Sequence, residues 1–74
     1  MLKGIHADDL KVIAGRGGGF HIDAREYSPD DLKVMAGRLS SGGQIILSHS
    51  DCLSIDDMKV IAGRSGEGAT VIFQ

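Results

Sequence analysis

The sequence has few of the residues that small proteins use to reinforce a core. It contains no tryptophan, one cysteine (Cys52) and one proline (Pro29) in 74 residues, and aromatic residues make up 4% of the chain. A single cysteine cannot form a disulfide within the chain, which is typical of a reducing compartment, so we expect a cytoplasmic protein. So few aromatic side chains exclude a base-stacking platform for single-stranded nucleic acid.

Long apolar runs and a strong charge of one sign are also missing. No segment approaches the ~20 consecutive apolar residues that a membrane-spanning helix needs, so we expect no membrane partner. The net charge of −2 argues against nucleic acid as a partner, because nucleic-acid-binding surfaces are usually basic. With 42% hydrophobic residues, the chain is expected to fold as one globular domain rather than stay disordered.

What the sequence does contain is a nonapeptide that occurs three times. The copies are DDLKVIAGR at Asp8–Arg16, DDLKVMAGR at Asp30–Arg38 and DDMKVIAGR at Asp56–Arg64. Self-similarity at a period of roughly 20–50 residues indicates a repeat protein, in which each unit buries its apolar face against its neighbour. We expect three units, at about residues 1–19, 20–43 and 44–74.

Each nonapeptide has the pattern of a short helix. Ser28 and Ser54 stand two residues before an Asp pair, where a hydroxyl can accept a hydrogen bond from the first free amides of a helix. The Asp pairs fall in the first turn, where carboxylates favour the positive end of the helix dipole. We expect Gly15, Gly37 and Gly63 to end the helices in the left-handed conformation, and their small size to let neighbouring helices approach closely.

Candidate strands alternate with these helices. Phe20–Arg25, Gln44–Ser48 and Thr70–Phe73 follow glycine-containing linkers, and Met1–Lys3 is a weaker fourth strand. The alternating order predicts an α/β fold in which right-handed crossovers build a small parallel sheet of three or four strands. Crossovers of one hand between adjacent strands place the three short helices on one face, so the array is solenoid-like.

A sheet that is covered on one face leaves its other face and its edge strands open. Such surfaces favour association. Six side chains are candidates for contacts there: Ile45, Leu47 and Phe73 as apolar contacts, and His21, Asp23 and Arg25 as polar ones. A shift of one residue in the assignment of faces would exchange the two sets. The favoured function is a non-enzymatic assembly module that self-associates, or binds a protein partner, through the bare face or an edge strand.

The repeated basic residues allow a second function. They form two rows, Lys11, Lys33 and Lys59, and Arg16, Arg38 and Arg64. Such rows could let a small inhibitor or adaptor dock on an acidic or nucleic-acid-like partner. The local explanation is that each lysine follows an aspartate by three positions on the helix surface, and that each arginine stands near a helix C-terminus.

A third hypothesis concerns the residues that follow the second strand. His49, Asp51 and Cys52 lie where parallel sheets usually place ligands, and such residues could bind zinc or activate the thiol. Their spacing lacks the paired ligands of a closed zinc site. We therefore expect no metal or cofactor, and a cysteine packed at the strand-to-helix corner. The glycines at 17–19 and 42–43 follow helices instead of preceding them, which excludes a phosphate-binding loop.

Overall fold

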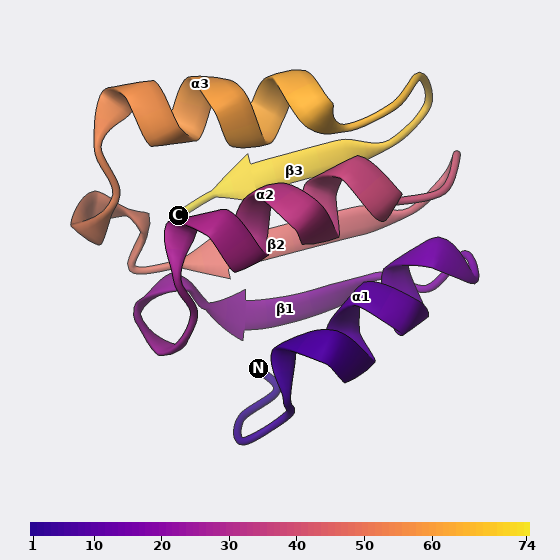
Figure 1. Ribbon diagram of the computed structural model, residues 1–74, viewed down its shortest axis with the longest axis horizontal. Helices are drawn as coiled ribbons and strands as arrows, with labels where there is room; N and C mark the ends of the chain where they lie inside the picture. The colour runs from indigo at the N-terminus through magenta and orange to yellow at the C-terminus, as the bar shows by residue number, and fades with distance from the viewer.

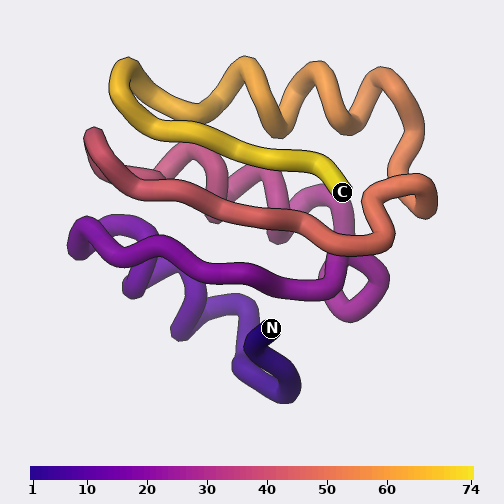
Figure 2. Tube along the Cα trace, turned by 180° about the vertical axis from the view of Figure 1, so that it is seen from behind, coloured from indigo at the N-terminus to yellow at the C-terminus, as the bar shows by residue number.

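The computed structural model describes residues 1–74 and contains three helices and a three-stranded parallel sheet. The helices are α1 (Ala7–Gly15), α2 (Pro29–Arg38) and α3 (Ile55–Arg64), and the strands are β1 (Phe20–Asp23), β2 (Gln44–Ser48) and β3 (Thr70–Phe73). The strands are arranged in the order of the sequence. The helices lie side by side on one face of the sheet (Figure 1), and the opposite face is bare when seen from behind (Figure 2). The predicted α/β repeat is confirmed.

The helices begin where the capping residues predict. The hydroxyl of Ser28 accepts a hydrogen bond from the amide of Asp31, and that of Ser54 accepts one from the amide of Asp57, each at 3.1 Å. In the first repeat the imidazole Nδ1 of His6 takes the place of the serine and accepts a hydrogen bond from the amide of Asp8. Each helix therefore has a side-chain acceptor for one of its free N-terminal amides.

The glycines of the nonapeptide do not end the helices in the left-handed conformation, so this expectation is wrong. Gly15, Gly37 and Gly63 lie within the last turns of α1, α2 and α3. The left-handed glycines are instead found in the connecting segments: Gly4, Gly17, Gly42 and Gly68. A β-carbon placed on Gly15 would lie 3.9 Å from the carbonyl oxygen of Arg38 in α2. Gly15 and Gly37 therefore lie where adjacent helices meet, whereas a β-carbon on Gly63 would meet no atom within 4 Å.

The sheet register decides which side chains the helices cover. Phe20 of β1 pairs with Ile45 of β2, and Ile22 pairs with Leu47. These side chains form the core under the helices, together with residues such as Leu10, Leu32, Met35 and Ile61 of the helices. The expectation that Ile45 and Leu47 lie on the bare face is wrong, because they are only 2% and 1% exposed. Phe73 lies in register with Leu47 and is partly buried against the same core.

The face assignment fails because the units differ by one residue between strand and helix. Aligning the helices places Asp23 opposite His49, whereas in the sheet Asp23 pairs with Ser48. The connection from Ser48 to the cap Ser54 is one residue longer than that from Asp23 to the cap Ser28. His49 accommodates the additional residue in the left-handed conformation, with φ of 57°. A one-residue slip exchanges the two faces of a strand.

The ends of the predicted strands also differ from the structure. A short 3-10 turn (Ala24–Glu26) follows β1, so Arg25 lies outside the strand in which it was expected. The N-terminal segment forms one isolated bridge, between Leu2 and Ile22, in place of a fourth strand. The longest helices have ten residues, and none of the helices is long and apolar enough to cross a bilayer.

Candidate functional site

The bare face of the sheet carries a mixed row of side chains. His21, Ile46 and Ile72 are neighbours in register on β1, β2 and β3, and each is partly buried. Polar pairs flank this row on either side: Gln44 with Thr70, and Asp23 with Ser48. The bare face therefore presents two isoleucines within a polar frame instead of the apolar set that we expected.

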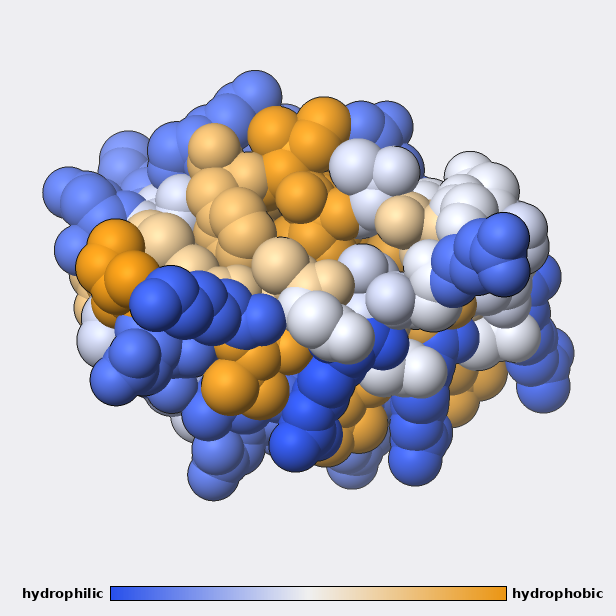
Figure 3. All heavy atoms as spheres, turned by 90° about the horizontal axis from the view of Figure 1, so that it is seen from above, coloured by the Kyte–Doolittle hydropathy of each residue, from blue (hydrophilic) through white to orange (hydrophobic).

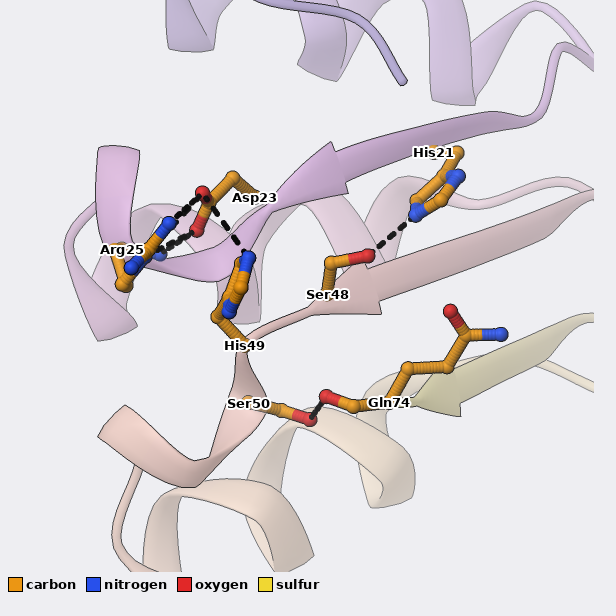
Figure 4. Close-up of polar contacts among 7 residues, drawn as sticks. All are labelled: His21, Asp23, Arg25, Ser48, His49, Ser50 and Gln74. Carbon is orange, nitrogen blue, oxygen red and sulfur yellow. Dashed lines mark hydrogen bonds and ion pairs between the residues drawn. The ribbon is translucent and has the colours of Figure 1, made fainter.

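A hydrogen bond between two strands crosses this face. Nε2 of His21 and the hydroxyl of Ser48 are hydrogen-bonded (Figure 4). A serine beside an imidazole is the pairing that activated serine nucleophiles use. Here His21 makes no second side-chain hydrogen bond, and the structure has no pocket beside the pair. The pair joins β1 to β2, and we assign it that structural role.

Asp23 and Arg25 form the most tightly bound charged pair of the molecule. The Asp23 carboxylate is buried and accepts hydrogen bonds from the amide of Arg25 at 2.9 Å and from its Nη2 at 2.8 Å (Figure 4). The guanidinium of Arg25 lowers the pKa of Asp23 from 3.8 to about 2. Asp23 thereby caps the 3-10 turn that leads towards α2. Both residues act within the fold and are not free polar contacts.

The depressed pKa of Asp23 predicts a pH dependence of stability. Between about pH 4 and pH 2 the unfolded chain binds a proton at Asp23 that the folded chain does not, so stability falls as the pH falls through this range. We expect Asp23→Asn to show a shallower loss than the unmodified chain when urea midpoints are measured by circular dichroism. Asp51→Asn, an exposed carboxylate with no ion pair, is the control. If the urea midpoints of the unmodified chain and Asp23→Asn fell equally between pH 4 and pH 2, this role of Asp23 would be contradicted.

The residues that follow β2 do not assemble a metal site. Nε2 of His49 lies 3.9 Å from Oδ2 of Asp23, whereas Asp51 and Cys52 are exposed on the next turn. No three His, Cys, Asp or Glu side chains gather closely enough to hold a metal ion. The expectation of a packed Cys52 is wrong, because the turn directs Ser50 inward instead. The hydroxyl of Ser50 donates to the carbonyl oxygen of Gln74 at 2.6 Å.

Two of the three lysines in the lysine row form ion pairs with an aspartate of the neighbouring helix. Nζ of Lys11 lies 3.0 Å from Oδ1 of Asp31, and Nζ of Lys33 lies 2.9 Å from Oδ1 of Asp57. Hydrogen bonds from these lysines lower the pKa of both aspartates. Two of the three predicted pairs within one helix are also present but longer, 3.4 Å for Lys11 with Asp8 and 3.7 Å for Lys33 with Asp30. The third, between Lys59 and Asp56, does not form. We call these inter-helix pairs the lysine ladder.

The arginine row remains exposed. Arg16, Arg38 and Arg64 stand at or just after the helix C-termini, and none of them forms an ion pair. Cations at these positions are favoured by the helix dipole. With two of the three lysines already paired, the two basic rows do not form one continuous positive surface.

Strand β3 forms one open edge of the sheet. It pairs with β2 on one side and has no strand on the other. The amides of Thr70 and Gln74 donate to carbonyl oxygens at β2, so with a period of two the backbone groups of Val71 and Phe73 point to the open side. An edge strand with unpaired backbone groups is a template for pairing.

The comparisons with known proteins identify no relative. No protein-family model matches the chain, and neither a curated protein nor a solved structure matches it. The fold defines the class of protein, a small α/β repeat with a parallel sheet. Its function has to be inferred from its own residues and their geometry.

Proposed function

We propose that this chain is a non-enzymatic assembly module that self-associates through the open edge of its sheet. The observation that carries the proposal is that no element covers β3 on its outer side, where Val71 and Phe73 present free backbone groups and partly exposed side chains. Strand addition at such an edge gains main-chain hydrogen bonds and buries apolar side chains together.

The edge is favoured over the bare face as the contact surface. The apolar part of the bare face is limited to Ile46 and Ile72. Polar side chains surround them, including His21 and Ser48, which bind each other. Docking of an acidic partner on the basic rows receives less support, because Lys11 and Lys33 are paired within the chain.

Sedimentation velocity over a micromolar concentration series tests the proposal. We expect the average mass of the unmodified chain to rise above that of the monomer as the concentration increases. Val71→Pro removes an amide from the open side without removing one that bonds to β2, so it should weaken association while the fold persists. Ile46→Ser, on the bare face, is the control and should associate normally. A monomer at every concentration would overturn the proposal, and loss of association in Ile46→Ser alone would transfer the contact to the bare face.

A further inference from the structure

We propose that the partner at this edge is a second copy of the chain, stacked head to tail so that it continues the array of repeats. The α3–β3 end of one copy would meet the α1 end of the next, and Lys59 would pair with Asp9. This inference rests on the proposed function. It adds which two surfaces meet and in which direction.

The lysine ladder provides the first argument. Within the chain, the lysine of each helix binds the second aspartate of the following helix: Lys11 binds Asp31, and Lys33 binds Asp57. Lys59 holds the equivalent position on α3, which is the outer helix at one end of the layer. Asp9 is the equivalent aspartate on α1, the outer helix at the other end. Both are exposed and neither forms an ion pair. One end of the helix layer therefore carries an unpaired lysine, and the other end carries an unpaired aspartate of the kind that this lysine binds within the chain.

The burial of apolar side chains also differs between the two ends of the helix layer and its middle. Ile13 of α1 is 39% exposed, whereas the equivalent Met35 and Ile61 are 0% and 1% exposed because a preceding helix covers them. At the opposite end, Ala62 of α3 is exposed although the equivalent alanines of α1 and α2 are fully buried. Each end thus exposes a surface that the middle of the array buries against a neighbouring unit.

The sheet continues this surface at the α3 end. Val71 and Phe73 lie in register with the fully covered Ile45 and Leu47, yet on the edge strand they are only partly buried. Figure 3 looks onto this end of the molecule and shows apolar side chains gathered in a band with hydrophilic residues around it. A further helix placed beside α3 would cover these side chains more completely.

The α1 end supplies the helix that such a contact needs. In the next copy, α1 would occupy the place of a fourth helix, with Ile13 against the α3–β3 end and Asp9 beside Lys59. The opposite edge of the sheet, at β1, carries no regular strand: Leu2 forms one isolated bridge with Ile22, and its amide donates to the carbonyl oxygen of His21. Because the two ends differ, the contact is heterologous, and a stacked pair still has one free α1 end and one free α3–β3 end. Such contacts build open chains or closed rings.

Charge reversal tests the direction of stacking. Lys59→Glu makes both ends acidic and Asp9→Lys makes both ends basic, so each variant alone should associate at least about tenfold more weakly than the unmodified chain. An equimolar mixture of the two variants restores opposite charges at every contact, and the double variant restores them within a single chain. We therefore expect both to regain association in sedimentation velocity.

Two variants of the central helix serve as matched controls. Arg38→Glu and Asp30→Lys change the net charge by the same amounts on α2, away from both ends, and should leave association near that of the unmodified chain. Circular dichroism verifies that every variant is folded. If the unmodified chain associates but the end variants behave like the controls, or their mixture stays monomeric, head-to-tail stacking is overturned while association by another surface stands. If the unmodified chain is monomeric, the proposed function fails as well.

Discussion

Leu47→Ala is expected to lower the free energy of unfolding by about 2–5 kcal/mol, the usual cost of emptying a fully buried leucine site. Leu47 is 1% exposed and lies in register with Ile22 and Phe73 under the helices. A chain of this length has a total stability of roughly 4–11 kcal/mol, taken from the usual range per residue. The substitution therefore removes a large part of the stability, and urea unfolding followed by circular dichroism measures the loss.

The control is the neighbouring residue on the opposite face. Ile46 lies on the bare face, where solvent already reaches it, so Ile46→Ala should cost less than half as much as Leu47→Ala. The comparison tests the face assignment directly, because adjacent strand residues point to opposite faces. A greater loss for Ile46→Ala than for Leu47→Ala would place the helices on the other face of the sheet.

Gly19→Ala is expected to destabilise the protein by about 1–3 kcal/mol, as overpacking at a site without room usually does. A β-carbon on Gly19 would lie 2.6 Å from the carbonyl oxygen of Gln44 and 3.2 Å from its amide nitrogen. Both are backbone atoms at the start of β2, so the clash cannot be relieved by turning a side chain. The backbone must shift where β1 begins to pair with β2. Thermal unfolding measures the effect.

Gly63→Ala is the same chemical change as Gly19→Ala, but at this site it should increase the stability of the protein. Gly63 lies inside α3, and a β-carbon there would meet no atom within 4 Å. Alanine is favoured over glycine inside a helix by about 0.5–1 kcal/mol, so this variant should be more stable than the unmodified chain. A stabilised Gly19→Ala would contradict the close contact of Gly19 with the backbone of Gln44. A destabilised Gly63→Ala would contradict the open space beside Gly63 in α3.

Much of the fold could be predicted because the same residues that mark the start of a helix or a strand occur in each of the three units. The serine caps, the acidic first turns and the glycine-rich linkers before each strand mark every helix and strand to within a few residues. The strand between Phe20 and Asp23 even shows its faces, since apolar Phe20 and Ile22 alternate with polar His21 and Asp23. Short alternating strands of this kind leave little freedom in topology.

The faces of β2 could not be read from its own sequence. Ile45, Ile46 and Leu47 are consecutive apolar residues, so the period-two alternation that distinguishes core from solvent is missing. Aligning the units on their helices then introduced an error of one residue, because His49 adds a position between strand and helix. The regular pattern of β1, carried across the sheet by register, would have corrected it.

The lysine ladder cannot be predicted from the spacing within one helix. The spacing of three residues between Asp8 and Lys11 already accounts for both charges as a pair within α1, and it does not indicate a partner on α2. The shorter contact, from Lys11 to Asp31, depends on how far α1 lies from α2, which is a property of packing. The available signal is that both residues recur in every nonapeptide, so that Lys11 and Lys33 each have a carboxylate at the same position of the next nonapeptide.

Chemical shifts of an obligate pair of variants test head-to-tail stacking most directly. Ala62→Arg obstructs the α3 end of one chain, and Asp9→Arg gives the other chain an α1 end that repels Lys59, so the mixture can form only one kind of contact. With ¹⁵N-labelled Ala62→Arg and an excess of the unlabelled partner, we expect amide shift changes confined to the region around Asp9 and Ile13. With the labels exchanged, the changes should fall around Lys59, Val71 and Phe73. Changes centred on the bare face, or the same surface responding in both experiments, would contradict it.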